Sequence, residues 1–96
     1  MADGSPWRVA PNANLIWRTW GDESVVFDPR SGDTHLLDTV SREVLALLEQ
    51  QALALPELCH VTASRLNLPE DADLDRYVQQ LVRQFADLGL LETVSA

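Results

Sequence analysis

SVVFDPRSGDTHLLD, residues 24–38, is the stretch that decides the fold. Both of its ends carry apolar and β-branched side chains that suit strands. Its centre, Pro29–Asp33, combines a proline of fixed φ with a glycine that is free to adopt positive φ, which favours a hairpin loop. The stretch therefore predicts two antiparallel strands, Ser24–Asp28 and Thr34–Leu37, joined by that loop.

A third strand is predicted just before this hairpin. Residues 15–20 (LIWRTW) are rich in apolar, aromatic and β-branched types, and Gly21-Asp22-Glu23 supplies a turn. The result is a three-stranded antiparallel sheet with Thr34–Leu37 as an outer strand. Trp7-Arg8-Val9 is a candidate for a short extra pairing, on which the prediction does not depend.

The remainder of the chain has helical periodicity. Asp38 can accept hydrogen bonds from the free amides of a first helix, and Asp71 or Asp73 can do the same for a third. A second helix opens at Pro56, with Leu55 where a Ser or Thr cap is usual. The apolar positions at helical spacing are Val40, Val44, Leu47 and Leu48 in the first helix, then Leu58, Val61 and Leu66 in the second.

The third helix carries the broadest apolar set of the three. Gly89 is expected to end it, with Leu90 folded back on its last turn. We expect its buried stripe to contain Leu74, Val78, Leu81, Phe85 and Leu88, flanked by Tyr77 and Val82.

Composition limits the class of protein. A chain of 96 residues with 46% apolar residues predicts one α+β domain, residues 1–96, with strands and helices segregated along the sequence. No segment is long and apolar enough to cross a bilayer, no signal peptide precedes the domain, and Cys59 has no second cysteine to pair with, so the expected location is cytoplasmic. The net charge of −8 and seven scattered arginines argue against nucleic acid and anionic membrane as partners.

No catalytic or metal-binding signature emerges. Cys59 and His60 are neighbours, but adjacent helical positions point about 100° apart, so they do not form a catalytic pair. We expect a buried thiol and an exposed imidazole. The acidic run Glu70–Asp73 lacks the spacing and glycine of a calcium loop and suits a helix start. The chain is therefore predicted to be no enzyme and to need no cofactor or metal.

The outer strand is the candidate site. Thr34–Leu37 contains no Pro or Lys, the usual devices that prevent a further strand from adding to a sheet edge. Trp17 is expected to lie in the core, and the place of Trp20 is open.

Three strands followed by three helices is the order of a winged-helix-like module, and residues 24–38 followed by Val44–Leu48 resemble PqqD-like proteins, the peptide chaperones of ribosomal peptide modification. Trp17 and Trp20 ahead of Gly32–Leu37 are similar to the branch called the HPr-rel-A system. Members of that branch are encoded alongside a kinase-like protein related to HPr kinase. The likeness runs from about Trp7 to Glu92, with Leu37-Asp38 where the family usually carries Leu-Asn.

The resemblance implies that the leader segment of a precursor peptide pairs with the outer strand and lies between that strand and the third helix. The expected site residues are Thr34, His35, Leu36 and Leu37 on the strand and Arg76, Tyr77, Gln80, Leu81 and Arg83 on the helix. It also implies a partner that modifies the peptide, such as an HPr kinase-related enzyme.

Two other functions stay open. A winged-helix DNA-binding regulator would place the third helix in the major groove, although that helix and the hairpin loop carry more acids than arginines. A structural subunit could form a homodimer through its open strand edge. If the molecule's own tail covered that edge, the peptide-binding hypothesis would fail.

Overall fold

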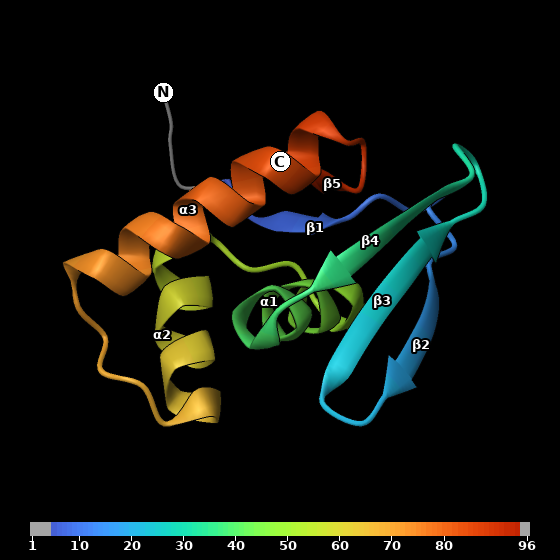
Figure 1. The fold of residues 1–96 in the computed structure, drawn as a ribbon. Coiled ribbons are helices and arrows are strands. Elements are labelled where there is room, and N and C mark those ends of the chain that lie inside the picture. Colours follow the sequence, from blue (N-terminus) through green and yellow to red (C-terminus); the bar gives the residue numbers. More distant parts are fainter. Residues whose placement is uncertain (1–4, 95–96) are drawn as a thin grey trace.

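The computed structural model describes residues 5–94, and it contains the expected three-stranded sheet. Strands β2 (Ile16–Trp20), β3 (Glu23–Asp28) and β4 (Asp33–Leu37) are antiparallel neighbours in the order β2-β3-β4. Gly21 (φ 56°) lies in the first turn and Gly32 (φ 80°) in the second, both in the left-handed region that a glycine adopts without strain. The two predicted hairpins are confirmed, and β4 is an outer strand (Figure 1).

The two faces of this sheet differ. Cross-strand partners share a face, so buried Val26 places Trp17 and His35 on the inner side. Trp17 packs against the core as expected, and its Nε1 donates to Glu49 Oε1 at 3.0 Å. The outer side carries Ile16, Trp20 and Leu36, which are exposed.

Three helices follow the sheet. Helix α1 (Thr39–Gln50) is capped by Asp38, whose Oδ1 accepts from Ser41 N at 2.8 Å. Helix α2 (Leu55–Leu66) has Ala54 in the cap position and no side-chain cap, so the helix begins one residue earlier than the sequence suggested. Helix α3 (Ala72–Asp87) is capped by Asp71 rather than Asp73, through a hydrogen bond from Leu74 N at 3.0 Å.

A second sheet was not predicted. Strands β1 (Trp7–Val9) and β5 (Leu91–Thr93) pair antiparallel, and the side chain of Arg8 binds Glu92 at 2.6 Å. β1 also exchanges backbone hydrogen bonds with Leu53, through Trp7 N and Trp7 O. The extra pairing suspected at Trp7–Val9 therefore exists, but its partner is the segment after α3.

The core lies where α1, α2 and α3 meet the inner side of the sheet. The predicted α3 stripe is confirmed at Leu74, Val78, Leu81 and Phe85. Two details were wrong: Val82 is buried rather than flanking, and Leu88 is 42% exposed rather than buried. Leu88 lies beyond the last helical residue, where Gly89 (φ 80°) turns the chain so that buried Leu90 donates its N–H to Phe85 O at 2.9 Å.

Candidate functional site

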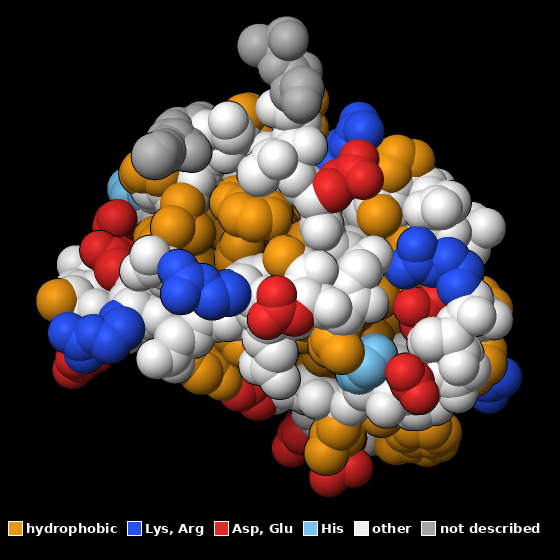
Figure 2. All heavy atoms as spheres, turned by 90° about the horizontal axis from the view of Figure 1, so that it is seen from above, with side chains coloured by type: hydrophobic (Ala, Val, Ile, Leu, Met, Phe, Trp, Pro, Cys, Tyr) orange, Lys and Arg blue, Asp and Glu red, His pale blue; other side chains and the backbone are white. Residues whose placement is uncertain are grey.

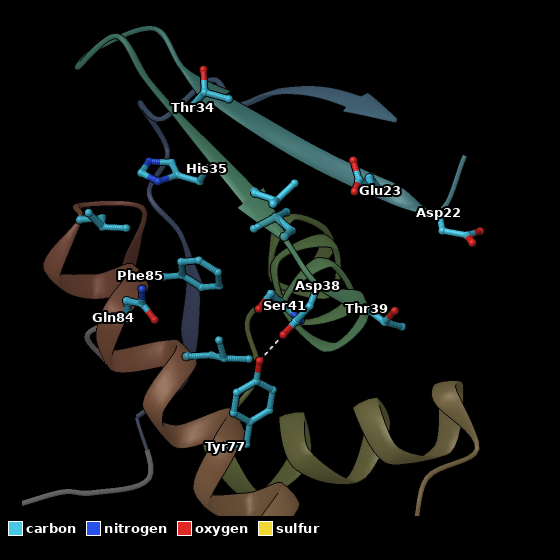
Figure 3. A pocket seen from close by; sticks show the side chains of 14 residues that line it. Asp22, Glu23, Thr34, His35, Asp38, Thr39, Ser41, Tyr77, Gln84 and Phe85 are labelled. Atoms are coloured by element: carbon cyan, nitrogen blue, oxygen red, sulfur yellow. Dashed lines mark hydrogen bonds between the residues drawn. The ribbon is translucent and has the colours of Figure 1, made fainter. Parts of the chain in front are cut away.

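A groove of about 730 Å³ lies between β4 and α3. Figure 3 shows that the side chains of Tyr77, Gln84 and Phe85 reach it from α3 and that His35 reaches it from β4. One end is formed by the start of α1 and the β2–β3 turn. The residues that line it are Asp22, Glu23, Thr34, His35, Leu36, Leu37, Asp38, Thr39, Ser41, Tyr77, Leu81, Gln84, Phe85 and Leu88.

The groove brings together six of the nine residues expected at the site, namely Thr34, His35, Leu36, Leu37, Tyr77 and Leu81. Arg76, Gln80 and Arg83 line a different hollow, which they share with Gln79. The reason is helical geometry: at 100° per residue, positions 76, 80 and 83 turn away from the face that carries 77, 81 and 88. The structure therefore does not place these three side chains in the groove.

Sequence reasoning missed the other lining residues. Gln84, Phe85 and Leu88 complete the helical wall. Leu88 was expected in the buried stripe of the third helix, so the sequence did not mark it as a lining residue. Asp22 and Glu23 gave no signal either, because only the folded hairpin brings their turn to the start of α1.

Backbone hydrogen bonds decide which groups of β4 are free. In an antiparallel sheet, successive residues of a central strand bond to alternate neighbours. The two-residue loop Gly21-Asp22 joins Trp20 to Glu23, and in such a hairpin these two flanking residues bond to each other through their backbone groups. The backbone groups of Glu23 therefore point to β2, and those of the next residue, Ser24, point to β4. Ser24 pairs with Leu37, so the backbone groups of Leu37, and then of His35 and Asp33, bond to β3.

It follows that Thr34 and Leu36 direct their N–H and C=O groups away from β3. Within residues 5–94, neither takes part in a backbone hydrogen bond outside the strand pairing. The tail strand β5 pairs with β1 and leaves this edge uncovered. An extended segment from another molecule could therefore form four hydrogen bonds here, two with each residue.

Side chains alternate across the same edge. His35 and Leu37 lie on the inner side, and His35 points toward the α3 wall of the groove (Figure 3), whereas Leu36 is 70% exposed on the outer side. The side chains of a peptide strand added to this edge, called the guest strand below, would also alternate between the two sides. Every second side chain would enter the groove against Leu81, Phe85 and Leu88, and the others would lie beside Leu36.

One hydrogen bond crosses the groove at its polar end. The hydroxyl of Tyr77 on α3 donates to Asp38 Oδ2 at the start of α1 (Figure 3). This bond raises the pKa of Tyr77, and burial adds to that effect. Burial acts to raise the pKa of Asp38 as well, but the hydrogen bonds from Tyr77 and Ser41 outweigh it, so the pKa of Asp38 is lowered. The bond fixes the width of the groove at this point.

Cys59 and His60, the neighbours noted in the sequence, lie in different surroundings. Burial, together with the nearby charge of Asp75, raises the pKa of the Cys59 thiol to about 12, so this buried cysteine is not a thiolate near neutral pH. His60 is exposed and pairs with Glu70 at 2.8 Å. Within residues 5–94, His, Cys, Asp and Glu form no group of three that could hold a metal ion, and no helix is long and apolar enough to span a bilayer.

Neither a protein-family model nor a curated protein matches the sequence. Two solved structures are similar. TbiB1, solved in complex with the TbiA(beta) leader peptide, is 20% identical, with a TM-score of 0.70 over 93% of this chain and 99% of that one. The second is the PqqD truncation of Methylobacterium extorquens PqqCD, described as a functional and stand-alone RiPP recognition element. It is 18% identical, with a TM-score of 0.68 over 94% of this chain and 93% of that one. The fold expected from the resemblance to PqqD-like proteins is confirmed.

Proposed function

We propose that this chain, which has the fold of a PqqD-type RiPP recognition element, is a non-catalytic peptide chaperone. It binds the leader segment of a ribosomally made precursor by strand addition to β4 and presents that precursor to a modifying enzyme. The observation that most strongly supports this proposal is the unpaired edge of β4 at Thr34 and Leu36, beside a groove that has an apolar wall. TbiB1, which shares the fold, was solved with a leader peptide bound.

The expected affinity is modest. Four backbone hydrogen bonds at about 1 kcal/mol net each and two buried apolar anchors at about 2 kcal/mol each give roughly 8 kcal/mol before further costs. Ordering the peptide and losing its translational freedom reduce this figure. Since 8 kcal/mol corresponds to a dissociation constant of about 1 μM, these costs weaken the expected binding to the high-micromolar range or beyond, which suits a chaperone that must release its cargo.

A DNA-binding role fits the surface poorly. On α3, Arg76 donates to Asp73 at 3.2 Å, and Arg83 is the one other arginine of a helix that also carries Asp75 and Asp87. Figure 2 shows red and blue side chains interspersed on this face rather than a continuous basic patch. Phosphate binding needs such a patch.

Three finer points have less support. An HPr kinase-related protein as the modifying enzyme is supported by the sequence resemblance alone, and a cytoplasmic location is supported by the composition. A homodimer through β4 stays a prediction, and it would compete with the peptide for Thr34 and Leu36.

The proposal is tested by selecting binders from a displayed library of random peptides and mapping the selected peptide on the labelled protein by amide chemical shifts. We expect the largest shifts at Thr34–Leu37 and at Tyr77, Leu81 and Phe85. Shifts confined to the hollow lined by Arg76, Gln79, Gln80 and Arg83 would exclude the groove.

Two variants of Leu36 separate the contribution of its backbone N–H to peptide binding from that of its side chain. Leu36→Pro removes the outward N–H without removing a hydrogen bond to β3, so the sheet is retained and binding falls by about tenfold. Leu36→Ala keeps that N–H and is the matched control, with a smaller loss. Equal affinity of Leu36→Pro and the wild type would rule out strand addition, provided circular dichroism shows both are folded.

A further inference from the structure

The two ends of the groove differ in charge. Asp22, Glu23 and Asp38 gather at the end where β4 leads into α1, and all three are exposed. Within the part of the chain that the structure describes, neither Asp22 nor Glu23 forms an ion pair or a side-chain hydrogen bond, whereas Asp38 binds Tyr77 and Ser41. The groove lining contains no Lys or Arg. This end therefore presents uncompensated negative charge.

The opposite end of the groove has no acidic lining residue. The hydrogen bond between Tyr77 and Asp38 fixes the N-terminal half of α3 to the end of β4, and Figure 3 shows Phe85 and Gln84 near His35, farther back along that strand. Leu88 lies one turn beyond Gln84 and is 42% exposed, although it lines the groove. A guest side chain placed here would meet Phe85 and Leu88 and no acid.

The direction of the bound peptide strand decides which of its residues lie at each end of the groove. Both pairings in this sheet are antiparallel, and antiparallel addition continues the same geometry. A guest strand antiparallel to β4 has its N-terminal part opposite Leu37 and its C-terminal part opposite Thr34. Its N-terminal residues would therefore lie at the acidic end, and the residues that follow would lie against the apolar wall.

We infer that the groove selects a peptide with a Lys or Arg immediately before a segment of alternating apolar residues. This inference rests on the proposed function and deepens it by naming the class of leader segment. Each basic side chain would extend over the end of β4 toward Asp22 and Glu23. An exposed pair of this kind raises affinity roughly threefold, so two basic residues give about tenfold at low salt. The effect shrinks as salt rises, because these charges are exposed.

The same displayed library of random peptides supplies the first test. We expect selected sequences to be enriched in Lys and Arg on the N-terminal side of the alternating apolar segment. Enrichment of Asp and Glu there, no charge preference, or basic residues on the C-terminal side would overturn the inference and leave strand addition intact. If no peptide is enriched over an empty support, the proposed function itself fails.

Synthetic peptides give the second test. The selected apolar segment is made with two Arg, two Gln or two Glu at its N-terminus, and each peptide is titrated into the folded chain. The Arg form should bind about tenfold more tightly than the neutral Gln form to the wild type, and only about twofold more tightly to Asp22→Asn/Glu23→Gln. The Glu form should bind more weakly to the wild type than the Gln form, because the acidic end repels it.

The control variant Glu57→Gln/Asp87→Asn removes the same amount of charge from exposed residues that lie outside β4 and outside the groove lining. It should keep the preference of the wild type. An equal loss of preference in both double variants would show that net charge, rather than the acidic end of the groove, attracts the peptide, and would overturn the inference.

Discussion

Asp38 connects the fold and the groove through one side chain. Its Oδ1 caps α1 by accepting from Ser41 N at 2.8 Å, and its Oδ2 accepts from the Tyr77 hydroxyl on α3. Asn is as good a helix cap as Asp. A change to Asn therefore separates the two roles, because it keeps the cap and removes the charge that Tyr77 faces.

The Asp38→Asn variant is predicted to lower the pKa of Tyr77 toward its ordinary value of about 10. Tyr77 is the single tyrosine of the chain, so near-ultraviolet absorbance measures its ionisation directly. Because the folded pKa is raised, the bond stabilises the protein below the unfolded pKa of about 10, and this stabilisation is lost as pH rises through the folded pKa. An unchanged tyrosine titration in the variant would show that the bond does not form.

Thr62 is a second residue whose hydrogen bonding has a measurable consequence. Its side chain on α2 is 0% exposed, and its Oγ1 has no hydrogen-bond partner among the residues that the structure describes. Thr62→Val replaces a buried hydroxyl by a methyl group of similar shape. The free energy of unfolding should rise by about 1 kcal/mol in denaturant titration. A loss of stability would mean that a buried partner, such as water, satisfies the hydroxyl.

At the scale of elements, Arg30 ties the β3–β4 loop to the end of α3. Its Nη2 donates to Gly89 O at 2.9 Å, and its Nε donates to Asp28 Oδ1 at 3.2 Å. Asp28 is only 2% exposed. The hydrogen bond from the Arg30 side chain lowers the pKa of Asp28 against the opposing effect of burial. The loop is thereby fixed to the turn that follows α3.

Arg30→Ala is predicted to raise the pKa of Asp28 and to move acid unfolding to higher pH. A carboxyl with a lowered folded pKa stabilises the protein above its unfolded pKa, near 4, and this stabilisation is lost as pH falls through the folded value. Carboxyl carbon shifts of Asp28 and the midpoint of acid unfolding report the two effects. Arg83→Ala, which removes an exposed arginine on α3, is the control and should move neither.

Local patterns predicted most of these elements. Alternation, helix caps and helical spacing predict strands β2 to β4 and helices α1 and α3 to within a few residues of their observed bounds. β5 could not be predicted, because Leu91–Thr93 is three residues long and its partner is Trp7–Val9, at the other end of the chain. Short strands are specified by the surface that receives them rather than by their own residues.

The residues that line the groove could be predicted only in part. The open edge of β4 follows from strand order, and Tyr77 and Leu81 follow from the apolar face of α3. Helical spacing identifies that face but not how far round it the groove extends. Arg76, Gln80 and Arg83 were therefore assigned to the groove, although they lie on the far flank.

At the scale of the whole molecule, the β1–β5 sheet joins the two ends of the described chain. Val94 N donates to Pro6 O at 2.8 Å, and Arg8 binds Glu92 across the strands. The segment after α3 is thus held by β1, and β4 is left open. Within residues 5–94, no strand has to be displaced before another chain pairs with β4.

Amide hydrogen exchange of β4, with and without a selected peptide, tests strand addition most directly. In the free protein, His35 and Leu37 should exchange slowly because their amides bond to β3, whereas Thr34 and Leu36 should exchange fast. Saturation with peptide should protect Thr34 and Leu36 and leave the other two unchanged. Fast exchange at Thr34 and Leu36 in the complex, or protection there before any peptide is added, would contradict the account.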